Sequence, residues 1–289
     1  MARLTTSARR WIVPTVAIAL VGVLICALAA LSHWRRDRTA TRSLPSLPAA
    51  FATQIPTRVL WAWEEPEDLH TLPPSIAVAY LAETDILTDH IAVLPRHQPL
   101  WPAPAAPLIA VVRMETRPGF ADTPQLRAAL ANHLAAYGLR RNVHALQLDF
   151  DATQSQQDFY RGVLDALRPQ LPRSLPLSIT ALVSWCGPHS WLHMLPLDEA
   201  VPMEFRMGGP RALAFANSTR LRNAIRYPIT EPLCRTSLGL STDEPWPASI
   251  SSLNPATRVY LFSPHPWRPA ELAAISTTPL TALAPESAR

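Results

Sequence analysis

The chain has 289 residues, of which 48% are hydrophobic and 17% charged, a composition typical of a folded domain and too apolar for an intrinsically disordered chain. Its net charge of +4 comes from the first 42 residues, which carry seven arginines and one aspartate, whereas the remainder carries 19 basic and 21 acidic residues. This balance excludes a nucleic-acid footprint on the folded part, and the absence of lysine excludes Schiff-base, P-loop and lysine-base chemistry.

The first predicted element is an uncharged, mostly apolar segment at residues 12–31. As a helix rising about 1.5 Å per residue, it is long enough to cross a hydrocarbon core of roughly 30 Å. Its length favours an uncleaved anchor over a signal peptide, although the run Ala27, Leu28, Ala29 resembles a cleavage site. We therefore expect a cytoplasmic tail (1–11), a transmembrane or signal helix (12–31), a Pro/Ser-rich linker (39–56) and one domain (57–289). A single membrane pass would hold this domain on the periplasmic side of the inner membrane, and the domain would be secreted if the segment is cleaved.

Eight β-like runs follow the linker and alternate with helical or loop segments. They lie at residues 58–63, 76–81, 108–116, 145–149, 177–183, 200–206, 238–242 and 258–263. This alternation predicts parallel strands joined by crossovers. Because the chain has only eight glycines and no Gly-rich strand-to-helix turn, an α/β fold of the (β/α)₈ TIM-barrel type fits better than an open doubly wound sheet.

Two helices are predicted from the spacing of apolar residues. In residues 123–137, Leu126, Leu130 and Leu134 recur every four positions, and residues 155–171 show a similar period. Elsewhere the helical signals are short, and 31 prolines indicate long ordered loops.

Polar residues alternate with apolar ones in several of the predicted strands. Arg113 and Glu115 do so in one strand, and Asp149 and Asp151 do so in the next. Alternation places each set on one face, and in a barrel that face is the interior near the C-terminal mouth, where active sites of this fold lie. The alternative is a set of buried salt bridges, such as Arg113 with Glu204, that only fills the barrel.

The most specific stretch is Gln147-Leu-Asp-Phe-Asp151, which is followed by the helix at 159–168 and the strand at 177–181. These segments resemble the family-18 chitinase type of glycoside hydrolase barrel, whose fourth strand carries an Asp-x-Asp-x-Glu signature. Asp149 and Asp151 match its two aspartates. The glutamate that donates the proton in that family would fall at Thr153, so that acid is missing and the family's substrate-assisted mechanism cannot be carried over.

The domain as a whole resembles a bacterial family described only as a domain of unknown function, DUF3142. The resembling segments lie at residues 60–69, 112–116, 147–151, 178–186, 198–208 and 241–245, and they cover most of residues 57–265. The resemblance implies a barrel related to sugar-cleaving enzymes and no established activity.

Hydrolysis of a glycosidic bond needs one protonated carboxyl group and one ionised carboxylate. We predict Asp151 as the acid/base, Asp149 as a deeper group that tunes it, and Glu204 as the second carboxylate. A competing scheme places the second carboxylate at Asp243 or Glu244, after the seventh strand.

Indole rings stack on the apolar faces of sugars while polar groups bind hydroxyls, and each tryptophan alone is also consistent with core packing. The predicted substrate-binding residues are Trp61, Trp63, Glu64, Arg113, Glu115, Gln147, Trp185, Glu199, Arg206, Asp243 and Glu244.

Cys186 and Cys234 are consistent with one disulfide in an oxidising compartment, or equally with two buried thiols. The nine histidines show no metal-ligand spacing, so we predict neither a metal nor another cofactor. We expect an exported barrel that binds, and cleaves, an envelope polysaccharide or glycan. The alternatives are a non-catalytic carbohydrate-binding barrel and a structural envelope protein with an ion-paired interior. The oligomeric state is left open.

Overall fold

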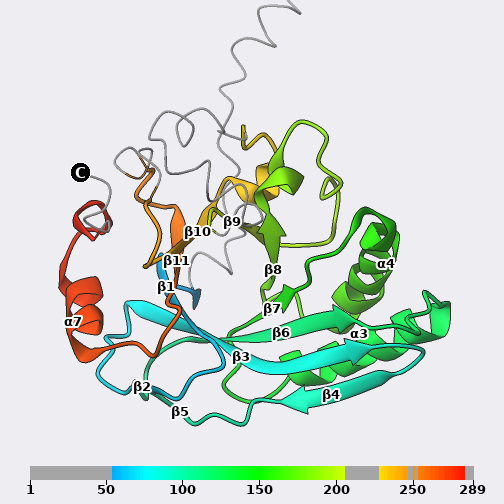
Figure 1. Cartoon of the computed structure of the whole chain (residues 1–289), viewed down its shortest axis with the longest axis horizontal. Coiled ribbons are helices and arrows are strands. Elements are labelled where there is room, and N and C mark those ends of the chain that lie inside the picture. The colour runs from blue at the N-terminus through cyan, green and yellow to red at the C-terminus, as the bar shows by residue number, and fades with distance from the viewer. Residues whose placement is uncertain (1–53, 206–227, 247–249, 251–252, 284–289) are drawn as a thin grey trace, which may run out of the picture. The chain divides into compact units, whose positions relative to one another are not determined.

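The wall of the barrel consists of eight parallel strands, arranged in the order β1-β11-β10-β9-β8-β7-β6-β3, and it closes because β1 also pairs with β3 (Figure 1). The structure, a computed structural model, describes residues 54–205, 228–246, 250 and 253–283. The predicted tail, membrane or signal helix and most of the linker lie outside these residues. Within the described part, no helix is both long and apolar enough to span a bilayer.

All eight strands lie where the sequence predicts them, so the parallel barrel is confirmed. Their bounds are β1 (Arg58–Ala62), β3 (Ile76–Leu87), β6 (Leu108–Thr116), β7 (Ala145–Asp149), β8 (Leu177–Leu182), β9 (Glu199–Met203), β10 (Ser237–Ser241) and β11 (Arg258–Phe262).

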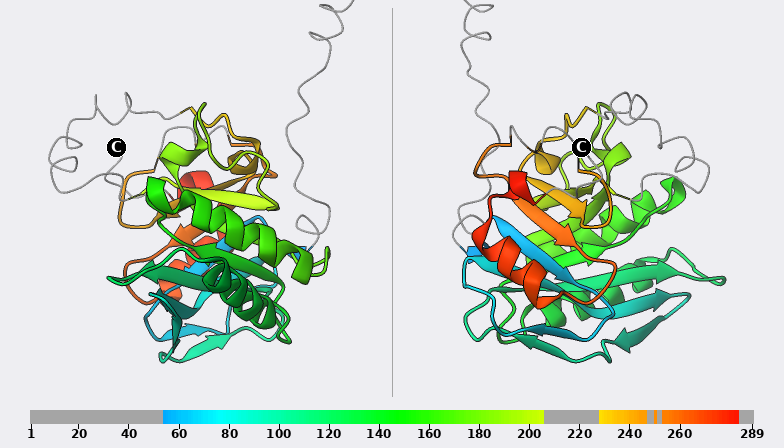
Figure 2. Two further views of the ribbon diagram at one scale, coloured as in Figure 1. Left: turned by 90° about the vertical axis from the view of Figure 1, so that its right-hand side faces the viewer. Right: turned by 60° about the vertical axis from the view of Figure 1, so that its left-hand side comes forward.

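The helical layer differs from the eight helices that a strict (β/α)₈ pattern implies. The described residues form three α-helices, α3 (Pro124–Gly138), α4 (Gln157–Leu167) and α7 (Pro269–Thr277). Figure 2 shows α3 and α4 side by side, and both pack on the outward faces of β6, β7 and β8 in one buried apolar cluster. Helix α7 packs in the same way on β11 and β1.

Short strands and turns replace helices in several of the other connections. The link from β1 to β3 contains β2 (Glu67–Leu69), and the link from β3 to β6 contains β4 (Ile91–Pro95) and β5 (Leu100–Pro102). β2 pairs with β5, and β4 pairs antiparallel with the second half of β3. A 3₁₀ turn, η4 (Val183–Cys186), follows β8. Proline is frequent throughout, which disfavours long helices in these links.

The N-terminal end of the barrel is filled by a buried ion pair. Arg258 and Glu199 are the first residues of β11 and β9, and Arg258 Nη1 lies 2.7 Å from Glu199 Oε1. The other guanidinium nitrogens of Arg258 donate to the carbonyl oxygens of Ile55 and Pro56. Tyr260 donates its hydroxyl proton to Glu199 Oε2 at 2.7 Å. Because the pair is fully buried, these additional hydrogen bonds offset part of its desolvation cost.

The hydrogen bonds continue across the interior from this ion pair. Ser178 donates to Glu199 at 3.1 Å, the Gln147 amide donates to Ser178 at 3.1 Å, and Trp61 Nε1 donates to Gln147 Oε1 at 2.8 Å. All of these side chains are buried. The network therefore links β11, β9, β8, β7 and β1 across the barrel and satisfies the polar groups it buries.

Aromatic rings fill the interior above this network on the β1, β9 and β11 side. The rings of Trp61 and Tyr260 lie 5.1 Å apart, and those of Phe205 and Phe262 stack at 5.5 Å. Trp61 lies against β10 at Gly239, where a Cβ atom would be 3.0 Å from Trp61 Cη2. Glycine at this position therefore makes room for the indole.

A disulfide joins Cys186, in the turn after β8, to Cys234, in the turn before β10. The two Cα atoms lie 5.8 Å apart, and both residues are buried. The backbone N–H groups of Thr230 and Glu231 both donate to the Cys186 carbonyl oxygen, which holds the two segments together beside the crosslink.

The buried ion pair leads to a stability prediction. Glu199→Gln removes the carboxylate charge that lies 2.7 Å from the buried Arg258 guanidinium, so we expect the free energy of unfolding to fall by about 3 kcal/mol. The matched control is Asp165→Asn, which removes an exposed carboxylate on α4 and is expected to change it by less than about 0.5 kcal/mol. Denaturant titration measures both variants against the wild type. A Glu199→Gln protein that unfolds at the midpoint of the Asp165→Asn control would contradict the structural role of Glu199.

The crosslink leads to a second stability prediction. The two cysteines are 48 positions apart, and a disulfide closing a loop of this size typically stabilises by about 2–4 kcal/mol. We expect the double variant Cys186→Ser, Cys234→Ser to lose stability in this range. The wild-type protein in reductant is expected to unfold at the midpoint of the variant; a midpoint that does not respond to reductant would show that the bond does not form.

Candidate active site

Two adjacent cavities lie at the C-terminal ends of β6, β7 and β8. The first, of about 260 Å³, is polar and is lined from β6 by Arg113 to Arg117 and from β7 by Asp149 to Asp151. The second, of about 450 Å³, lies over β8 and the start of α4. Thr153 lines both cavities, so they share one wall. This is the end of the barrel where sites of this fold are built.

The acidic cavity contains three carboxyl groups and two guanidinium groups. Arg113 and Asp149 are paired neighbours on β6 and β7. Glu115 accepts from both arginines, with Arg113 Nη2 at 3.0 Å and Arg117 Nη2 at 2.5 Å. Arg113 therefore pairs with Glu115 on its own strand. These ion pairs hold the Glu115 side chain beside the two aspartates.

Asp149 lies deeper than Asp151. Its Oδ1 accepts a hydrogen bond from Thr180 Oγ1 at 2.6 Å, and the side chain is half-buried, whereas Asp151 is exposed. Burial raises the pKa of Asp149 to about 6; the Thr180 hydrogen bond and Arg113 oppose this rise, and the charges of Asp151 and Glu115 add to it. Desolvation also raises the pKa of Asp151, against the attraction of Arg113. The pair therefore retains a proton at higher pH than ordinary aspartates.

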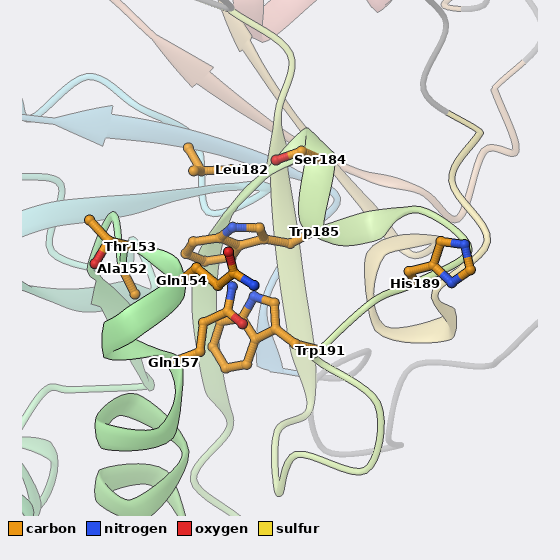
Figure 3. A pocket seen from close by; sticks show the side chains of 9 residues that line it. All are labelled: Ala152, Thr153, Gln154, Gln157, Leu182, Ser184, Trp185, His189 and Trp191. Atoms are coloured by element: carbon orange, nitrogen blue, oxygen red, sulfur yellow. The ribbon is translucent and has the colours of Figure 1, made fainter.

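The second cavity is lined by two indoles and two amides. The rings of Trp185 and Trp191 meet edge to face with centroids 5.1 Å apart. Figure 3 shows the side chains of Gln154 and Gln157 beside these rings, whereas His189 stands apart on the far side. An apolar ring face next to amide donors and acceptors suits a ligand that is apolar on one side and rich in hydroxyl groups at its edge.

The polar start of α4 positions this wall. Thr153 N donates to Gln156 Oε1 at 2.8 Å, and Gln156 Nε2 donates to Thr116 Oγ1 at 2.8 Å. The loop after β7 is thereby tied to the end of β6. Arg161 on α4 donates to the Trp191 carbonyl oxygen at 2.6 Å, which holds the second indole against the same helix.

The structure brings together one part of the predicted site. The predicted residues that line the two cavities are Asp149, Asp151, Arg113, Glu115 and Trp185.

Three predicted binding residues lie elsewhere. Trp61, Gln147 and Glu199 belong to the buried interior network, and Glu199 is the first residue of its strand, at the opposite end from the mouth. They line neither cavity, and their part in substrate binding stays a prediction. Alternation shows which face of a strand a residue occupies but not its height along the barrel.

Four further predicted residues lie at or after the C-terminal ends of β1 and β10, outside the two cavities. Trp63 meets Phe262 edge to face at 6.4 Å, Glu64 is exposed, and Asp243 accepts a hydrogen bond from Ser241. Glu244 is half-buried nearby.

Glu204, predicted as the second carboxylate, follows β9. It alternates with Met203 and Phe205, which pack with the interior apolar cluster, and it does not line either cavity. Arg206 lies outside the described residues.

Several cavity residues were not predicted. They are Arg117, Gln154, Gln156, Gln157, Ser184 and His189. The polar run at residues 153–157, which follows a strand and two aspartates, is a signal that would have indicated the three glutamines, because loops at this end of a barrel form its sites.

Comparison with known proteins agrees with the family resemblance. Residues 104–213 match the family model described as "Domain of unknown function (DUF3142)", which confirms the resemblance over the segment that contains β6 to β9 and both cavities. The crystal structure of the Bacillus cereus spore cortex-lytic enzyme SleL is similar at 13% identity with a TM-score of 0.39. The alignment covers 64% of this chain and 51% of that one, so the chain spans about half of that enzyme. No curated protein sequence matches the chain.

The acidic cavity leads to a titration prediction. With carboxyl-labelled aspartate, we expect NMR to show Asp149 titrating near pH 6, assigned by the signal lost in Asp149→Asn. Asp151→Asn should lower this pKa by removing a like charge, whereas Arg113→Gln and Thr180→Val should raise it by removing groups that favour the ionised form. An Asp149 that titrates near 4 in all variants would contradict the arrangement.

Proposed function

We propose that this protein, which matches the DUF3142 family over residues 104–213, binds a polysaccharide or glycan across the mouth of its barrel and hydrolyses a glycosidic bond there. The observation that carries the proposal is the pair Asp149 and Asp151 in an acidic cavity that shares a wall with an indole-lined cavity. Carboxyl groups supply the proton and the negative charge of the reaction, and indoles supply the apolar face of a sugar site.

The two aspartates have different roles in the proposed acid/base chemistry because they lie at different depths in the cavity. Asp151 is the more exposed and lines the cavity, so we assign it the proton transfer to the leaving oxygen. Asp149 lies beneath it with a pKa of about 6 and serves as the group that retains the proton and shares it with Asp151. Thr180 and Arg113 limit the rise in the pKa of Asp149, because both favour its ionised form.

Glu115 takes the role of the second carboxylate in this proposal. It lines the same cavity as the aspartates, and its two oxygens pair with Arg113 and Arg117, which fix the position of the carboxyl group. An ionised carboxylate at this point stabilises developing positive charge on the sugar or activates a water. Glu204, which the sequence suggested, has no cavity contact that supports the same role.

The substrate class follows from the second cavity. The half-buried Trp191 offers apolar ring surface with the buried Trp185 behind it, and Gln154 and Gln157 offer amide groups for hydroxyls (Figure 3). We propose that this surface binds the sugar unit next to the bond that is cleaved. The proposed location is the periplasmic side of the inner membrane, with residues 12–31 as the anchor. The Cys186–Cys234 disulfide supports an oxidising compartment.

A second candidate function is a glycan-binding barrel without catalysis. Thr153 supports it, because this exposed residue lines both cavities at the position where the family-18 signature has its proton-donating glutamate. In that case Asp149 and Asp151 would bind hydroxyls, and the indole-lined cavity would still bind a sugar unit.

The deciding experiment is hydrolysis of a panel of bacterial envelope polysaccharides and chitin-type oligomers by the purified full chain. We expect Asp151→Asn to lower product release by about 10²–10⁴-fold and Glu115→Gln to lower it strongly, while the exposed control Asp165→Asn remains active. The rate of the wild type should fall as pH rises through about 6, because the shared proton is then lost. No release from any substrate, with glycan binding that Trp191→Ala weakens, would favour the binding barrel.

A further inference from the structure

A second group of ionisable side chains lies outside the barrel interior, between β3 and α3. Glu83 and Asp85 are on the second half of β3, and His133 is on α3. None of the three lines either cavity at the mouth. An inference from them is therefore independent of the proposed function.

An irregularity in β3 brings these side chains together. The pairing register between β3 and β6 shifts between Leu81 and Glu83, and beyond this point Glu83, Asp85 and Leu87 share one face. Leu87 packs in the buried cluster that contains Leu126 and other residues of α3, so this face is turned toward the helix. Two carboxylates are thereby placed under α3 where a regular amphipathic strand would present apolar residues.

The donor atoms are close enough to share one ligand. His133 Nε2 lies 2.7 Å from Glu83 Oε1 and 3.5 Å from Asp85 Oδ1. One oxygen or nitrogen from each of the three residues lies within 4.8 Å of the other two. His133 is 27% exposed, which leaves a path to solvent, while Glu83 and Asp85 are buried.

Asp85 lacks the hydrogen bonds that a buried carboxylate needs. It is 0% exposed, and neither of its carboxylate oxygens forms a hydrogen bond; its ion pair is the 3.5 Å contact to His133. Among the described residues, no arginine pairs with Glu83 or Asp85. A buried group of this kind is expected to bind a further positive charge.

We propose that Glu83, Asp85 and His133 form a binding site for one divalent transition-metal cation, Zn²⁺ or Mn²⁺, that ties α3 to β3. Two carboxylate oxygens and one imidazole nitrogen are ligands that these ions accept, and water reaching the site past His133 completes the coordination. The cation would give the buried Asp85 oxygens, which have no hydrogen-bond partner, a ligand to bind. The ligands come from positions 83, 85 and 133, so they form no short sequence motif.

The test is metal retention by the untagged, chelator-treated full chain after equilibrium dialysis against Zn²⁺, Mn²⁺ or Ca²⁺, with bound metal measured by mass spectrometry. We expect about one equivalent of Zn²⁺ or Mn²⁺, weaker binding of Ca²⁺, and an affinity at least tenfold lower in Asp85→Asn and in His133→Gln. The matched control is the double variant Asp89→Asn, His90→Gln, which removes an exposed histidine–aspartate pair with a 2.7 Å contact. It should retain the wild-type affinity.

A wild-type protein that retains no metal, or one whose retention is unchanged in Asp85→Asn, would overturn the proposal. If the variants at positions 85 and 133 do not fold, Glu83→Gln is judged by the same criterion. Hydrogen exchange of the wild type gives a readout without any substitution. Added Zn²⁺ should slow exchange in β3 and α3, and protection confined to other segments would contradict the site.

Discussion

The structure depends on how the barrel accommodates two buried charges at the N-terminal end of its strands. Eight parallel strands that close on themselves enclose an interior that water cannot solvate, and Arg258 and Glu199 lie in it at the starts of their strands. Their mutual pairing, with hydrogen bonds from Tyr260 and Ser178, satisfies them. Because these groups neutralise one another, they link the strands at this end, whereas the opposite end carries the carboxyl groups that line the acidic cavity.

The contrast between Glu199 and Asp149 illustrates this division. Both are acidic residues that point into the barrel, and each accepts a hydrogen bond from β8, the strand between them. Ser178 donates to Glu199, and Thr180 donates to Asp149. Glu199 has an arginine within 2.7 Å, whereas Asp149 shares Arg113 with Glu115 and stands near Asp151. Burial without a dedicated counter-charge raises the pKa of Asp149 to about 6, and the difference in partners separates a supporting residue from a candidate catalytic one.

Much of the wall could be predicted from the sequence, because short apolar runs bounded by proline and polar residues mark each strand, and leucines at 126, 130 and 134 mark α3. Asp149 and Asp151 were predicted from their place at and just after the end of a strand, and both line the acidic cavity. The sequence could not show how far along the barrel axis a side chain lies. Gln147 belongs to the buried interior network, whereas Asp149, two positions later, lines the acidic cavity. The register shift after Leu81 was likewise invisible, since it depends on pairing with β6, and so the group formed with His133 was missed.

The fit between Trp61 and Gly239 has a consequence for how the sequence can change over evolution. The indole fills the space that a side chain at position 239 would need, and the Pro202 carbonyl oxygen, 3.3 Å from the same point, limits movement on the other side. A larger residue at 239 is therefore tolerated only together with a smaller ring at 61. In related barrels, these two positions are expected to covary although 178 residues separate them along the chain.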